Sequence, residues 1–197
     1  MDIALFSSMI IFAVVMAGTP GPNNMLLTFS GANFGFKRTL PQMAGIPVGI
    51  ASMILLMALG LNWVFQHYPL LQWGLKILGS AYLLYLAYRI LGQSTLAKQS
   101  MAKPLSFLES LGFQYLNPKA WMMTSSAVAS FAIPGEHYWP SIAGLVLSFF
   151  LVNPVTATVW VSFGKFIARW LSSPVARQNF NITMSCLTAG CVLLLWL

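Results

Sequence analysis

Long runs of apolar residues, separated by short polar connections, make up most of this chain. A helix needs about 20 predominantly apolar residues to cross a bilayer, and six runs come close to that length, although the last is short. They predict helices over residues 3–25 and beyond, 41–64, 70–91, 107–133, 138–166 and 182–197. Residues 30–40, with two glycines and two basic residues, read as a loop. The most polar stretch, residues 93–106, divides the chain into halves of approximately 1–92 and 107–197, with three predicted helices each.

The composition places the chain in a membrane. It is 58% hydrophobic and 7% charged, whereas soluble domains average about 25% charged residues, so this surface cannot face water. We therefore expect an all-α, polytopic membrane protein, a single transmembrane domain over residues 1–197 with the lipid bilayer as a partner. No basic patch is interleaved with aromatic residues outside the apolar runs, so nucleic-acid binding is not expected. Cys186 and Cys191 match no zinc spacing and read as packing thiols, so neither a metal nor a cofactor is expected.

The basic residues indicate how the helices are oriented. Connections 1–2, 3–4 and 5–6 hold Lys37, Arg38, Arg89, Lys98, Lys103, Lys165, Arg169 and Arg177. The opposite connections hold no Lys or Arg, and Asp2 and Glu136 fall on their side. Because cytoplasmic loops carry an excess of Lys and Arg, the pattern predicts three cytoplasmic loops, residues 93–106 among them. Both termini then lie on the outer, periplasmic side.

The first apolar run contains a segment that an ordinary helix does not tolerate: Thr19, Pro20, Gly21 and Pro22, followed by Asn23 and Asn24. Proline removes a backbone donor and clashes with the preceding turn. In hydrocarbon, the freed backbone groups need partners inside the protein or in a water-lined cavity. A broken helix with polar side chains at membrane depth is how transporters form substrate sites. We expect these six residues to bind substrate; a simple kink or the helix end is the alternative.

Asn117, Pro118 and Lys119 repeat this chemistry in the fourth run and add a lysine. An ionisable group inside the membrane costs several kcal/mol unless it is paired or hydrated, so Lys119 is a functional candidate. The alternative is a helix that begins at Ala120, with Lys119 reaching the cytoplasmic surface, but about 14 residues before Pro134 are too few to span. The predicted topology puts both breaks in the cytoplasmic half of the membrane, where they can face each other. Strict inverted symmetry would put the second break nearer the outside, so the two look like partners rather than symmetry mates.

Seven further residues have either a gating or a packing role: Gly45, Gly49, Lys76, Tyr82, Gln114, Asn153 and Pro154. Gly45 and Gly49 form a GxxxG pattern, whose default explanation is close helix packing. Lys76 either reaches back to the outer interface or takes part in gating. Tyr82 belongs to an interfacial aromatic belt. Asn153 and Pro154 form a third irregular point, for which a kink and a functional role are both open.

Several of these motifs together resemble the lysine exporter / homoserine-threonine resistance superfamily. The resemblance covers nearly the whole chain and rests on Thr-Pro-Gly-Pro-Asn in the first run, Gly45 and Gly49, residues 79–83, and Asn117-Pro118-Lys119. Residues 19–24, Gly35-Phe36, Ala102-Lys103-Pro104 with Ser106-Phe107, and Gln114 are similar to the cysteine and O-acetylserine exporter branch. The resemblance implies a secondary transporter of the inner membrane, with six spans, that exports a small neutral amino acid or derivative. Such export is usually taken to be coupled to the proton gradient.

The residues suggest how a zwitterionic amino acid would bind between the two breaks. Its carboxylate would meet Lys119 and the positive N-terminal end of a half-helix. Its ammonium would meet backbone carbonyls freed at Pro20 and Pro22 and the amides of Asn23, Asn24 and Asn117. The chain has three carboxylates, Asp2, Glu109 and Glu136, and none is predicted at mid-membrane. The proton carrier is therefore Lys119, Glu109 or the substrate itself.

Other functions remain open at this point. The superfamily also implies homoserine, threonine, leucine or lysine as substrates, and a homo-oligomer is compatible with the sequence. The scarcity of acidic residues disfavours a metal cargo. A membrane enzyme would need a poised acid–base pair or a metal cluster, and a non-transporting subunit would need no paired breaks. We therefore expect a transporter and not an enzyme.

Overall fold

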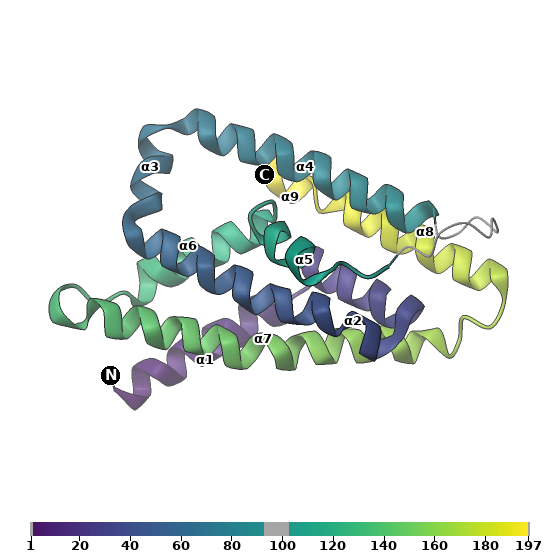
Figure 1. Cartoon of the computed structure of the whole chain (residues 1–197), viewed down its shortest axis with the longest axis horizontal. Coiled ribbons are helices and arrows are strands. Elements are labelled where there is room, and N and C mark those ends of the chain that lie inside the picture. Colours follow the sequence, from purple (N-terminus) through teal and green to yellow (C-terminus); the bar gives the residue numbers. More distant parts are fainter. Residues whose placement is uncertain (1, 93–102, 197) are drawn as a thin grey trace.

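The computed structural model describes residues 2–92 and 103–196, and all regular structure in these two segments is helical (Figure 1). The elements are α1 (Ile3–Gly18), α2 (Pro22–Leu56), the π-helix η1 (Met57–Leu61), α3 (Asn62–His67), α4 (Pro69–Gly92), α5 (Phe107–Gln114), α6 (Pro118–Phe131), the 3₁₀ turn η2 (Gly135–His137), α7 (Tyr138–Ala168), α8 (Pro174–Gly190) and α9 (Leu193–Trp196). Within the described residues, three helical segments are long and apolar enough to cross a membrane: Pro22–Leu61, Leu70–Gly92 and Gly135–Ala168.

The chain reverses direction within α2, at a single residue. Gly35 has φ 77° and ψ 174°, a conformation that favours glycine, and the helix continues on both sides of it. Ser30 Oγ donates to Gln42 Oε1 at 2.7 Å, although 12 residues of straight helix would separate the two by about 18 Å. The prediction of a loop over residues 30–40 is therefore wrong. One glycine makes the turn, and the basic residues after it are helical.

Two further predicted boundaries differ from the structure. The second predicted helix does not run unbroken to residue 64, because the π-helix η1, with Gly60 at φ 99°, follows α2. The last helix begins at Pro174 rather than at residue 182, with Ser173 as its N-cap. Proline is favoured in the first turn of a helix, and the polar residues that follow it concealed this start. The predicted connection residues 93–102, including Lys98 and Ala102, lie outside the described residues.

The helices form a bundle in which α7 packs along α1 and α2, α5 packs on α2, and α8 packs on α4. Glycines let backbones approach closely. A Cβ atom added to Gly31 would stand 2.2 Å from the carbonyl oxygen of Val161, and one added to Gly164 would stand 2.0 Å from that of Thr28. Gly45 and Gly49 face α5 in the same way, near the backbone oxygens of residues 107 and 111. These contacts bring α2 close to α7 on one side and to α5 on the other.

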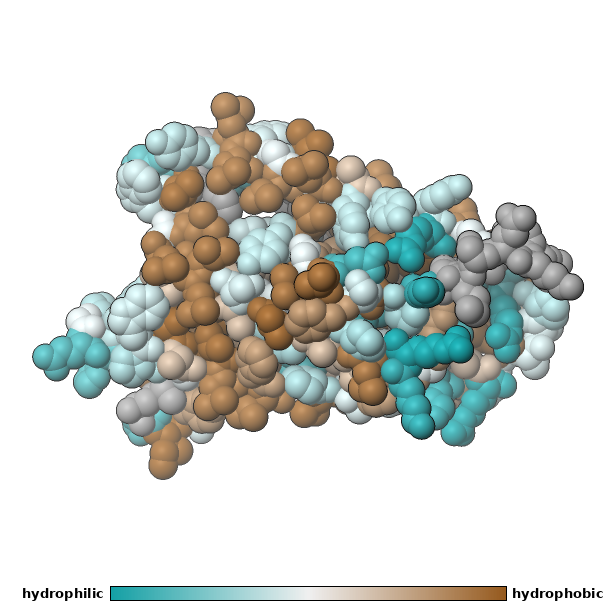
Figure 2. Space-filling view, in the orientation of Figure 1, coloured by the Kyte–Doolittle hydropathy of each residue, from teal (hydrophilic) through white to brown (hydrophobic). Residues whose placement is uncertain are grey.

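Polar and apolar residues are distributed as in a membrane protein. Many large apolar side chains are exposed, including Ile11, Leu59 and Val155, while polar side chains such as Gln42 and Gln114 are buried. Figure 2 shows hydrophobic residues over the middle of the molecule and hydrophilic residues gathered at one end. The turn of α2, the ends of α4 and α7 and the start of α8 meet at that end (Figure 1). The described basic residues of the predicted cytoplasmic loops lie on these elements, except Arg169 directly after α7 and Lys103 in the segment before α5. We call this end of the molecule the basic end.

Candidate functional site

Two non-helical junctions meet inside the bundle. The first, residues 19–21, lies between α1 and α2, where Thr19 and Gly21 have extended backbones. The second, residues 115–117, lies between α5 and α6. The Lys119 side chain, from the first turn of α6, connects them: its Nζ donates to Thr19 O at 2.6 Å, to Thr19 Oγ1 at 2.7 Å and to Pro20 O at 3.3 Å. Lys119 is half-buried, whereas Thr19 and Pro20 are exposed.

The C-terminal end of α1 is satisfied by side chains from three other elements. A helix end leaves four backbone carbonyls without intrahelical partners and carries a partial negative charge. Asn24 of α2 donates to Ala17 O at 2.9 Å and to Thr19 O at 2.7 Å. Trp160 of α7 donates to Gly18 O at 3.3 Å, and Lys119 supplies the cation. Sequence reasoning missed Trp160, because one tryptophan in an apolar helix carries no signal of its own.

Gly21 leaves room for the Lys119 side chain. A Cβ atom at this position would stand 2.8 Å from Lys119 Cδ and 3.3 Å from its Nζ. A side chain at residue 21 would therefore occupy the space through which Lys119 reaches Thr19. The glycine allows the two junctions to make contact.

An amide pair joins the first junction to α5. Asn23 Nδ2 donates to Gln114 Oε1 at 2.9 Å, and Gln114 Nε2 donates back to Asn23 Oδ1 at 3.1 Å. Gln114 Nε2 also donates to Ser110 O at 2.8 Å. At the second junction, Asn117 caps α6 by accepting a hydrogen bond from Lys119 N at 3.1 Å. Gln114 and Asn117 are buried, so these bonds form in the interior.

A cavity of about 30 Å³ lies between the junctions; we call it the central cavity. Of the predicted site residues, it is lined by Gly21, Asn23, Asn24, Asn117, Lys119 and Asn153. Thr156 of α7 also lines it, and the other lining residues are apolar. No Asp or Glu among the described residues lines the cavity. A water molecule takes up about 30 Å³ in the liquid. The central cavity is therefore smaller than an amino acid, and we call the conformation closed in this sense.

The other predicted residues lie around this cavity or away from it. Thr19 and Pro20 accept hydrogen bonds from Lys119. Pro22 is the first residue of α2, Pro118 is the first residue of α6, and Pro154 lies within α7. The interface between α2 and α5 contains Gly45, Gly49 and Gln114. Lys76 Nζ lies 6.0 and 5.9 Å from the ring centres of Trp73 and Trp196. The Tyr82 ring packs on Phe113. Neither Lys76 nor Tyr82 lines the central cavity.

Candidate metal ligands do not gather in the described segments. No group of three or more His, Cys, Asp or Glu residues there could hold a metal ion. Cys186 is exposed, Cys191 is buried, and both are free thiols. The chemistry that the central cavity offers is one amine, several amides and backbone carbonyls.

The fold and the site define a multi-pass helical membrane protein with a polar cavity where helices begin and end inside the bundle. The LysE type translocator family matches residues 14–196. The chain therefore belongs to this family of membrane translocators. It is 28% identical, over 95% of both chains, to proteins named cysteine/O-acetylserine efflux protein from Escherichia coli (strain K12) and Shigella sonnei (strain Ss046). No solved structure matches it.

Proposed function

We propose that the protein exports a small neutral amino acid or derivative, of the cysteine or O-acetylserine type, from the cytoplasm across the inner membrane. The names of its relatives support this substrate class. The observation that carries the proposal is the Lys119 amine, held between two helix junctions at the edge of a closed polar cavity. An intramembrane cation in such a place is expected to serve a substrate.

The proposed topology has six spans in two halves of three. α1 with the first arm of α2, and α5 with α6, would each form one broken span, the first and the fourth. The basic end would face the cytoplasm, because positively charged loops are retained there. Both termini would then be periplasmic.

The closed geometry suggests how a zwitterion would bind. Lys119 Nζ and the carbonyls of Thr19 and Pro20 now satisfy one another. A substrate carboxylate would accept hydrogen bonds from the Lys119 amine in place of the two carbonyls. The released carbonyls would then accept hydrogen bonds from the substrate ammonium. Each charged group exchanges one partner for another, so that no charge is left unpaired at membrane depth. A neutral amino acid carries the two charges that this exchange requires.

The lining of the cavity favours a substrate without a second positive charge. A cationic side chain would need a carboxylate partner, and the residues that line the central cavity supply none. Alternating access driven by the proton gradient is the proposed mode of transport. The proton carrier would be Lys119, Glu109 at the basic end, or the substrate.

Uptake into inverted membrane vesicles tests the proposal. Vesicles that contain the wild-type protein should accumulate radiolabelled cysteine or O-acetylserine above vesicles without it. Lys119→Met keeps a side chain of similar length but removes the amine, and we expect it to abolish accumulation. Lys76→Met is the matched control, because Lys76 contacts Trp73 and Trp196 away from the cavity, and it should accumulate normally. Equal accumulation by Lys119→Met and the wild type would overturn the site, and no accumulation by the wild type would overturn the function.

A further inference from the structure

Buried polar side chains continue from the central cavity toward the basic end. Gln114, which pairs with Asn23, donates to the backbone of Ser110. Ser110 Oγ donates to the backbone of Gln42 at 2.8 Å, and the Gln42 side chain accepts from Ser30 at 2.7 Å. Gln114, Ser110, Gln42 and Ser30 are 0, 1, 1 and 3% exposed. We call these four side chains, together with Asn23, the polar seam.

Apolar residues would fill the same space at a lower cost in free energy. Interhelical hydrogen bonds between membrane helices contribute only about 0.6 kcal/mol each on average, whereas a buried polar group is costly whenever its partner moves away. Ionisable residues that face the interior of a membrane protein mark the paths of substrates, and the polar seam runs from the cavity lined by Lys119 toward Arg89 and Lys103. The polar seam connects both arms of α2 to α5, and such a path would run between these elements.

A second cavity, also of about 30 Å³, lies at the other end of the polar seam. Ser30 and Gln42 line it from α2, Arg89 lines it from α4, and Lys103 lines it from the segment before α5. The other six lining residues are apolar. We call it the loading cavity. Its two cations lie at the basic end of the molecule, whereas the only charged residue that lines the central cavity is Lys119. Both cavities thus combine polar side chains with at least one cation.

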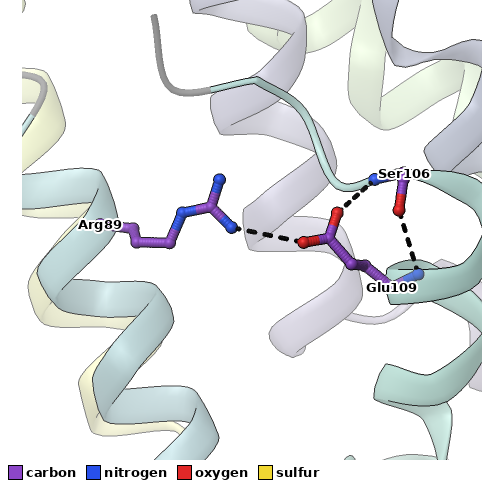
Figure 3. A network of polar contacts seen from close by, with 3 residues as sticks. All are labelled: Arg89, Ser106 and Glu109. Atoms are coloured by element: carbon purple, nitrogen blue, oxygen red, sulfur yellow. Dashed lines mark hydrogen bonds and ion pairs between the residues drawn. The ribbon is translucent and has the colours of Figure 1, made fainter. Parts of the chain in front are cut away.

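A fixed carboxylate lies beside the loading cavity. Figure 3 shows Arg89 reaching from α4 toward Glu109 in the first turn of α5. Arg89 Nη1 and Glu109 Oε1 are 3.8 Å apart, well beyond the 2.7–2.9 Å of a charge-assisted hydrogen bond. Glu109 is held in place by a capping box, in which its Oε2 accepts from Ser106 N at 2.8 Å and its own N donates to Ser106 Oγ at 3.2 Å. The two side chains form an ion pair, but not a close hydrogen bond.

We propose that the loading cavity is a second binding site, which takes the charged groups of a zwitterionic amino acid on the cytoplasmic side before it reaches Lys119. Arg89 and Lys103 bind the substrate carboxylate, and Glu109 Oε1 binds its ammonium. The substrate then passes along the polar seam once the Asn23–Gln114 pair opens. This inference rests on the proposed function, since the direction of export makes the basic end the side of substrate capture.

Concentration-dependent uptake into inverted vesicles separates capture from translocation, because the cytoplasmic face of the protein then faces the labelled substrate. We expect Arg89→Gln to raise the KM for cysteine about tenfold with little change in the maximal rate, which corresponds to about 1.4 kcal/mol. Lys103→Gln should act in the same direction. Arg169→Gln is the matched control: Arg169 lies at the same end, beside the Phe166 ring, and lines neither cavity. Its KM should stay at the wild-type value.

Competing analogues test the assignment of each charge. N-acetylcysteine keeps the carboxylate and lacks the ammonium, and cysteine methyl ester has the opposite pattern. Arg89→Gln should weaken competition by N-acetylcysteine more than by the ester, and Glu109→Gln should weaken competition by the ester more. If Arg89 and Glu109 only tie α4 to α5, both variants will weaken both competitors equally, which would overturn the second site. An unchanged KM for Arg89→Gln, or an equal rise for Arg169→Gln, would also overturn it. In each case uptake by the wild type would still support the proposed export.

Discussion

The reciprocal hydrogen bonds between Asn23 and Gln114 join the wall of the central cavity to α5, and their contribution to stability can be measured. The pair makes two interhelical bonds, of 2.9 and 3.1 Å. Such bonds in membrane proteins contribute about 0.6 kcal/mol each on average, with a maximum of about 1.7. We therefore expect a coupling free energy of about 1.2 kcal/mol between the two side chains, and less than about 3.4.

The two single substitutions should not be equal. Asn23→Ala leaves the fully buried Oε1 of Gln114 without its partner, and an unsatisfied buried polar group costs about 1–3 kcal/mol. Gln114→Leu leaves the amide of Asn23 at the wall of the central cavity, where a water molecule can satisfy it. Asn23→Ala should therefore lower the free energy of unfolding more than Gln114→Leu does.

The assay is equilibrium unfolding in mixed detergent micelles for the wild type, both single variants and the double variant. The double-mutant cycle isolates the coupling between the two residues. The double variant should lose less stability than the sum of the single losses, because neither amide is then left unpaired. If the losses of unfolding free energy in the two single variants add up to that of the double variant, within about 0.3–0.5 kcal/mol, the pair does not stabilise the contact between the wall of the central cavity and α5.

Two glycines provide further tests, each with a matched control. Gly31→Ala would place a methyl group 2.2 Å from Val161 O and should lower the free energy of unfolding by about 1–3 kcal/mol, whereas Gly74→Ala, with no neighbour within 4 Å, should raise it by up to about 1 kcal/mol. Thermal denaturation of the detergent-solubilised variants compares the two, and equal melting temperatures would contradict the close approach of α2 and α7. Gly21→Ala should displace Lys119 from Thr19 and slow vesicle uptake more than tenfold. Gly18→Ala, whose added Cβ atom would have no neighbour within 4 Å, should leave uptake unchanged. Uptake by Gly21→Ala at the wild-type rate would show that Lys119 does not need this space.

Local chemistry explains which features could be predicted from the sequence. Pro20 and Pro22 flank a glycine and Pro118 follows an asparagine, and proline disfavours helix at the residue before it, so the junctions could be located to within a few residues. A lone proline is a weaker signal, because Pro41, Pro47 and Pro154 lie inside helices. Lys119 could be predicted as a functional candidate because a charged residue in an apolar run is rare. Membrane class likewise follows from composition, because apolar runs of this length have few alternatives.

The missed features depend on tertiary contacts. The turn at Gly35 occupies one residue, so it leaves no polar loop to recognise, and its flanking polar residues are helical. Trp160 binds the end of α1 across 142 positions of sequence, a contact that no local pattern indicates. Ser30 falls in the predicted loop and Gln42 in the predicted second helix, and no local pattern pairs them until the turn at Gly35 brings them together. The pairing of Lys119 with the very carbonyls that were expected to be free could not be seen without the packing of α6 against α1.

A structure with substrate bound would test the central claim most directly. We predict the substrate carboxylate within hydrogen-bonding distance of Lys119 Nζ, the substrate ammonium on the carbonyls of Thr19 and Pro20, and a central cavity larger than 30 Å³. Substrate bound elsewhere, with the Lys119 amine still on Thr19 O at 2.6 Å, would contradict it.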